Sequence, residues 1–144
     1  MKSVFRQSGV GLIEILVTLV ILAIGILGLA GLQSQSLKNN ESSLQRSQAV
    51  VLSYAAFDML RVNRAAATNG SYNMSMTCAA PTGNTLVSND QAYWISTLQS
   101  SLGAGTCGSI NCQPTGDCTV IIQWNEQRAT GGSATQTLTT RSRL

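Results

Sequence analysis

The residues best suited to chemistry in this sequence are its four cysteines, Cys78, Cys107, Cys112 and Cys118. Their spacing does not suit zinc, because no two of them form a Cys-x2-Cys pair and the chain has no histidine. An even number of cysteines in an exported domain is typical of two disulfides, each contributing about 2 to 4 kcal/mol. Of the three possible pairings we favour Cys112 with Cys118, across a predicted hairpin, and Cys78 with Cys107.

The composition does not indicate a catalytic site. Charged residues make up 10% of the chain, and the missing histidine removes the commonest general base. Segments rich in Ser and Thr have no base beside them. The acids after residue 69 are Asp90, Asp117 and Glu126, and their spacing does not resemble a calcium-binding loop. We therefore expect no enzyme, no cofactor and no metal site.

Glu14 is the other residue with chemical potential, because it lies alone in an apolar segment. From Val10 to Leu32 there are 23 residues, and Glu14 is the only ionisable one. As a helix they would rise about 35 Å, enough for a hydrocarbon core of about 30 Å. A carboxylate there costs about 2.5 to 3.5 kcal/mol on insertion scales, so we expect it to have a partner. A cut between Gly9 and Val10 would create an amine that a neighbouring helix could bring to Glu14.

The charges around this segment predict its orientation. Lys2 and Arg6 precede it with no acid, which keeps the amino end in the cytoplasm and exports the rest. Without residues 1–9 the net charge falls from +3 to +1, seven basic residues against six acids, which argues against nucleic acid as a partner. A secretory signal cleaved near Gly28-Leu29-Ala30 is the alternative, but its apolar core would be shorter than the 18 uncharged residues of Ile15–Leu32.

Beyond Leu32 the helical pattern continues to an end that we place between Arg64 and Thr68. A break into two helices near Gly31 is the alternative. We expect one apolar stripe to face a core. It consists of Leu37, Leu44, Val51, Ala55, Met59 and Val62.

The carboxyl-terminal part predicts a small α+β domain. After a loop-like stretch at 70–90, where a short strand around Tyr72–Thr77 is possible, a helix capped at Ser88-Asn89-Asp90 should end at Gly103. Alternation then predicts an antiparallel sheet of three strands, at 108–112, 118–124 and 135–143, with the long helix lying across it. Trp94 and Trp124 lie on the apolar faces of their elements and are assigned to the core. Arg141 and Arg143 are assigned to a solvated edge strand rather than to DNA binding.

The amino-terminal motif resembles the class III signal of type IV prepilins and type II secretion pseudopilins. It reads Gly9-Val10-Gly11-Leu12-Ile13-Glu14 before the apolar run. The resemblance implies a type IV pilin-like fold, with a prepilin peptidase that cuts after Gly9 and methylates Val10, and with Glu14 supporting assembly. The family usually has phenylalanine and then Thr or Ser where this chain has Val10 and Gly11.

A second resemblance concerns the tail. The tryptophan-bearing helix, the Val120-x-Ile122-x-Trp124 strand and the ending Thr139-x-Arg141-x-x-Leu144 are similar to the PilV group of minor pilins. This implies a structural subunit that is assembled into a type IV pilus or primes it, with other pilins, the prepilin peptidase and the inner membrane as partners. A type II secretion pseudopilin, and a pilus-tip adhesin or DNA-uptake module, are the alternatives.

Together these observations predict four segments. They are a leader at 1–9, a transmembrane and filament-core helix at 10–32, an amphipathic continuation at 33–68, and a disulfide-bonded domain at 69–144. The expected location is the bacterial inner membrane, crossed once with the domain in the periplasm, and then the pilus.

Overall fold

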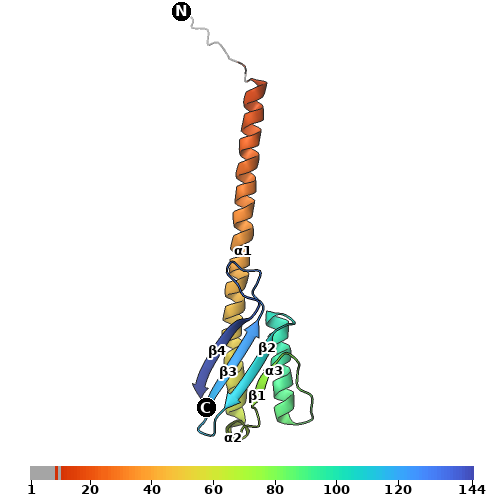
Figure 1. Cartoon of the computed structure of the whole chain (residues 1–144), viewed down its shortest axis with the longest axis vertical. Helices are drawn as coiled ribbons and strands as arrows, with labels where there is room; N and C mark the ends of the chain where they lie inside the picture. Colours follow the sequence, from red (N-terminus) through yellow and green to blue (C-terminus); the bar gives the residue numbers. More distant parts are fainter. Residues whose placement is uncertain (1–8, 10) are drawn as a thin grey trace, which may run out of the picture. The chain divides into compact units, whose positions relative to one another are not determined.

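The computed structural model describes residue 9 and residues 11–144. Its long helix, α1 (Leu12–Val62), is continuous through Gly25, Gly28 and Gly31, so the alternative of a break near Gly31 is wrong (Figure 1). The helix ends slightly earlier than expected, at Val62. After Asn63 the short helix α2 (Arg64–Thr68) continues to the predicted end. The chain divides into two compact units, residues 1–37 and Lys38–Leu144, which are described separately below.

The second unit contains one antiparallel sheet in the order β1-β2-β3-β4 (Figure 1). Its strands are β1 (Met74–Thr77), β2 (Cys107–Cys112), β3 (Asp117–Trp124) and β4 (Gln136–Arg143). The expected number of three strands is too low. The short β1 was only a possibility in the sequence, because polar loop residues surround its four residues, and its pairing with β2 is irregular in register.

The second long helix, α3 (Leu86–Leu102), ends before Gly103 as predicted but begins earlier than the predicted cap. Thr85 is the cap residue: its hydroxyl oxygen accepts from the backbone N–H of Ser88 at 3.1 Å, and the Ser88 hydroxyl oxygen accepts from the Thr85 N–H at 3.1 Å. Ser88 is therefore the third residue of the helix, where it completes a capping box, and not the residue at which the helix begins. The predicted cap at Ser88-Asn89-Asp90 lies near the start of the helix, but the residue that caps it is Thr85.

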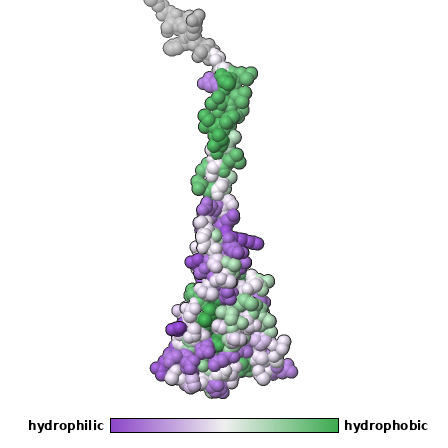
Figure 2. Space-filling model, viewed as in Figure 1, coloured by the Kyte–Doolittle hydropathy of each residue, from purple (hydrophilic) through white to green (hydrophobic). Residues whose placement is uncertain are grey.

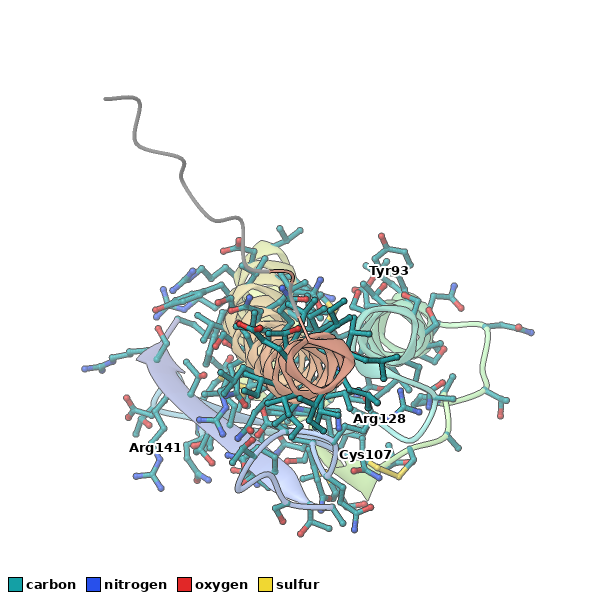
Figure 3. All side chains as sticks on the ribbon, turned by 90° about the horizontal axis from the view of Figure 1, so that it is seen from above. Tyr93, Cys107, Arg128 and Arg141 are labelled. Atoms are coloured by element: carbon teal, nitrogen blue, oxygen red, sulfur yellow. A yellow bond between two sulfur atoms is a disulfide. The ribbon has the colours of Figure 1, made fainter. Side chains whose placement is uncertain are left out.

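One face of the sheet forms the core together with α3 and the part of α1 that follows Leu37. Val120, Ile122 and Trp124 alternate inward along β3, and Trp94 is also buried, so the assignment of both tryptophans to the core is confirmed. Gly108 of β2 lies directly under Trp94: a Cβ atom there would be 2.6 Å from the indole ring. The view in Figure 3 has both helices on the same side of the strands.

The face of α1 that packs on the sheet differs from the predicted stripe. Its buried residues are Ala49, Ser53, Ala56, Phe57 and Leu60. Three of these have small side chains, which lets the helix backbone approach the strands while Trp94 and the β3 side chains supply the bulk. The predicted core stripe is wrong for five of its six residues, and Leu44, Val51 and Val62 are as much as 57%, 65% and 88% exposed. Met59 is the exception, since it is half-buried against the core.

The sheet as a whole confirms the predicted fold class. A long amino-terminal helix packs through its carboxyl-terminal part on a small antiparallel sheet with an extra helix, which is the α+β arrangement of type IV pilin-like proteins. Along β4 the predicted alternation is also present: Thr137, Thr139, Arg141 and Arg143 are exposed, while the residues between them are half-buried.

Candidate functional site

The amino end of α1 places Glu14 in the first helical turn. The carbonyl oxygen of Gly11 accepts from the backbone N–H groups of Glu14 at 3.0 Å and Ile15 at 3.3 Å, so the helix begins directly after this glycine. A carboxylate in the first turn interacts favourably with the positive end of the helix dipole. Within the part of the chain that the structure describes, no residue hydrogen-bonds or pairs with this carboxylate. Among the described residues, the site therefore has an acid without a counter-charge.

The two residues of the predicted cleavage site lie just before this turn. Gly9 is exposed, which leaves its backbone accessible. Val10 lies outside the described residues, so its roles as first mature residue and as methylation site stay predictions.

The apolar segment of the first unit is not buried by any residue that the structure describes. From Leu12 to Leu32 every large apolar side chain is at least 50% exposed. Figure 2 shows hydrophobic residues along this segment on the face in view. Among the described helices, α1 is the one long and apolar enough to cross a membrane. So much exposed apolar area is unfavourable in water, and lipid or other helices would cover it.

All four cysteines are joined in disulfides. Cys78 bonds to Cys107 and Cys112 to Cys118, which is the pairing favoured from the sequence. The first bridge ties the segment after β1 to the start of β2, near Cys107 in Figure 3, and the second joins directly opposed residues at the β2–β3 turn. The Gln99 side chain of α3 donates to the carbonyl oxygen of Cys78, so the first bridge is also held to the helix. With their sulfur atoms bonded to each other, these cysteines offer no thiolate to a metal.

A buried carboxylate that the sequence analysis considered only as a calcium ligand anchors the β3–β4 connection. Glu126 has a side chain only 1% exposed. It accepts a hydrogen bond from the Ser42 hydroxyl at 2.6 Å and two from the Arg46 guanidinium, at 3.0 and 2.8 Å. The Arg46 hydrogen bonds lower the pKa of Glu126, and this outweighs the effect of burial. The contact fixes the loop on α1.

The Glu126 loop also depends on one glycine. The carbonyl oxygen of Glu126 lies so close to Gly132 that a Cβ atom there would overlap it. The Glu126 N–H donates to the Ser133 carbonyl oxygen at 2.8 Å, which closes the loop on itself. In the sequence, the one sign of this buried contact was a lone glutamate shortly after Trp124, in a tail with few charges.

The acids weighed as calcium ligands have separate environments. Asp90 on α3 accepts from the Tyr72 hydroxyl, Asp117 at the start of β3 accepts from the Thr115 hydroxyl, and Glu126 is bound to Arg46. Among the described residues no group of three metal-binding side chains comes together. Arg141 projects from β4 away from the core (Figure 3), and Arg143 is opposite Asp117 in the sheet register.

Comparison with known proteins assigns the amino-terminal segment. Residues 4–30 match the model of the prokaryotic N-terminal methylation motif, and this match covers about a fifth of the chain. No curated protein and no solved structure matches the chain. The matched range contains Gly9, Glu14 and most of the uncovered apolar helix. Residues 4–30 are thus a prepilin-type signal of the kind that type IV pilin-like proteins carry.

Proposed function

We propose that this protein is a minor pilin, a structural subunit that is assembled into a type IV pilus or primes its assembly. The observation that carries the proposal is the methylation motif at residues 4–30, in which Gly9 and Glu14 precede an apolar helix that none of the described residues covers. Pilin-like subunits act by packing and not by catalysis, and the small disulfide-bonded domain is suited to that use.

The proposed mechanism begins in the membrane. A prepilin peptidase removes residues 1–9 on the cytoplasmic side and methylates Val10. Glu14, which has no counter-charge among the described residues, then pairs with the amino terminus of a neighbouring subunit. This pairing removes the cost of a lone carboxylate in lipid and sets the register of the two helices. The apolar helix passes from lipid into a bundle of like helices, and the domain stays outside it.

The choice of a minor pilin over a type II secretion pseudopilin rests on the similarity of the tail to the PilV group. Both kinds of subunit share the amino-terminal motif. Deletion of the gene distinguishes them, because we expect twitching motility and surface pili to decrease while secretion of exoproteins continues. Lost secretion with normal pili would assign the protein to the secretion system.

The decisive experiment is the mass of the mature protein. Full-length protein is purified from cells with and without an active prepilin peptidase. We expect the mass to decrease by residues 1–9 and to increase by one methyl group only where the peptidase is present, with fragmentation placing the methyl group on Val10. A mature chain that starts near Gly31 would indicate an ordinary secretory signal, and an uncut chain would indicate a plain membrane anchor.

A further inference from the structure

A groove of about 350 Å³ lies between the carboxyl-terminal part of α1 and α3, within the second unit. We call it the α1–α3 groove. It is lined by Leu52, Ala55, Met59, Val62, Asn63, Leu86, Asp90, Tyr93, Trp94 and Thr97. At its rim, Val62, Leu86 and Tyr93 are 88%, 62% and 74% exposed, and Figure 3 shows Tyr93 projecting from α3 away from the sheet. Large apolar side chains that surround a hollow in this way are typical of docking surfaces.

The floor of the groove is held by contacts within the fold, so we expect its shape to exist before anything binds. The indole N–H of Trp94 donates to the carbonyl oxygen of Leu52 at 3.0 Å, which ties α3 to α1. Trp94 is 3% exposed and belongs to the core. A docked partner therefore does not have to bear the cost of ordering the two helices.

The groove contains one charge, and that charge is negative. Asp90 is half-buried, and its Oδ2 atom accepts from the hydroxyl of the buried Tyr72 at 2.6 Å. The Tyr72 oxygen in turn accepts from the Asn63 amide at 3.4 Å. No described residue hydrogen-bonds to the other carboxylate oxygen, Oδ1, and none of the lining residues is basic. A group that filled the groove would have to supply a cation to pair with Asp90.

The apolar side of the groove explains the stripe that the sequence pattern assigned to the core. Ala55, Met59 and Val62 recur at helical spacing, yet the chain packs α1 on the sheet through a different face. The stripe thus gives α1 a second apolar face that is exposed at Ala55 and Val62, while Met59 between them is half-buried against the core. Such a face beside a second helix is the surface that an added helix packs against, with its side-chain ridge between the other two.

We propose that the α1–α3 groove docks an amphipathic helix of a partner protein, one that presents an apolar ridge with a Lys or Arg beside it. The ridge fills the space between Val62, Leu86 and Tyr93, and the cation pairs with Asp90. A lipid surface does not fit, since a half-buried carboxylate opposes both hydrocarbon and anionic headgroups. The proposal goes beyond the proposed function, because it concerns the domain and does not depend on cleavage at Gly9.

Photo-crosslinking in cells that make the full-length chain tests this docking. The photoreactive residue p-benzoylphenylalanine replaces Tyr93 at the groove or, as a matched control, Tyr54, a 54% exposed tyrosine of α1 outside the groove. Crosslinked products are digested and the joined peptide is identified by mass spectrometry. We expect an adduct from position 93 only, to a helical segment of another protein with a basic residue within one turn of its apolar side chains.

Charge variants in the same crosslinking strain test the role of Asp90. Asp90→Lys should lower the yield of the position-93 adduct about tenfold, and Asp90→Asn should lower it less. Asp117→Lys, which reverses an exposed carboxylate outside the groove, should leave the yield unchanged. Thermal unfolding of each purified variant confirms that it is folded.

Several results would overturn the docking proposal. They are equal adducts from positions 54 and 93, no adduct at 93 from folded protein, an adduct to lipid or to a second copy of this chain, and an adduct that Asp90→Lys does not weaken. Each leaves the mature mass of the protein unaffected, so the failure of this proposal is distinguishable from failure of the proposed function.

Discussion

The proposed role of Glu14 links the chemistry of a single residue to assembly. Its carboxylate has no counter-charge among the described residues, and we assign that role to the amino terminus of a neighbouring subunit. Glu14→Gln should therefore leave cleavage after Gly9 intact while the amount of the protein in sheared pili decreases about tenfold, which corresponds to about 1.4 kcal/mol. Immunoblots of pilus and membrane fractions measure both effects. Glu41→Gln, at an exposed glutamate beyond the apolar segment, is the control, and equal behaviour of the two variants would contradict the pairing.

Gly108 determines how closely α3 approaches the sheet. A Cβ atom at this position would lie 2.6 Å from the Trp94 ring and 3.1 Å from Ile95. Gly108→Ala should lower the free energy of unfolding by about 1 to 3 kcal/mol, because the ring must move within a packed core. Chemical denaturation of the purified protein measures the loss. At Gly105 a Cβ atom would meet nothing within 4 Å, so Gly105→Ala should cost much less; equal losses would show that the Trp94 contact is not the cause.

Glu126 makes the stability of the domain depend on pH in a defined direction. Its pKa is lowered in the folded protein from an ordinary value of 4.5, chiefly by the Arg46 hydrogen bonds. A lowered pKa stabilises the fold above the unfolded value, and that contribution is lost as pH falls through the folded pKa. Glu126→Gln should therefore lower the melting temperature at pH 7, and this difference should shrink as the pH falls below 4.5. A melting-temperature gap that stays constant with pH would contradict this account.

At the scale of elements, the two disulfides should differ in what they contribute. The Cys78–Cys107 bridge joins residues 29 apart, and Cys112–Cys118 joins residues 6 apart. Chain entropy alone gives about 3.6 and about 2.2 kcal/mol for these loops. Replacing Cys78 and Cys107 by serine should thus destabilise the domain by about 1.4 kcal/mol more than replacing Cys112 and Cys118. Denaturation of the two double variants tests the order, and the reverse order would mean that strain or contacts dominate over loop closure.

The elements also show which parts of the structure could be predicted from the sequence. Local patterns were sufficient for the inward alternation of Val120, Ile122 and Trp124 and for the end of α3 at Gly103, because each depends on residues close in the chain. The buried face of α1 was not predictable by periodicity, since the fold buries Ala49, Ser53 and Ala56 for their small size. It leaves most of the larger side chains of the stripe exposed.

Contacts between distant segments account for the remaining errors at the candidate sites. Arg46 and Glu126 are 80 residues apart, and no local rule pairs them before the β3–β4 loop is placed on α1. The amino-terminal motif depends instead on residues close in the chain. Gly9, Glu14 and the apolar run form a continuous signal, which the motif match at residues 4–30 supports. The sequence was most informative where function depends on a short linear pattern.

On the scale of the whole molecule, the division at Leu37 separates a unit with exposed apolar side chains from a unit with its own hydrophobic core. All residues of the hydrophobic core lie between Ala49 and Trp124, and both disulfides lie in the same unit. The first unit contributes none of these and exposes its apolar side chains. The fragment Lys38–Leu144 should therefore fold without the rest, be soluble without detergent and unfold in one cooperative transition, since small single domains usually do so.

Calorimetry and denaturant titration of that fragment test this independence, with the full-length chain in detergent as the reference. The fragment should keep the unfolding midpoint of the full-length protein within a few degrees, because removing residues 1–37 removes no core contact. The full-length chain should aggregate when detergent is withdrawn, since the side chains between Leu12 and Leu32 then face water. A fragment that lacks cooperative unfolding, or that aggregates as the full chain does, would mean that the amino-terminal helix stabilises the domain as well as anchoring it.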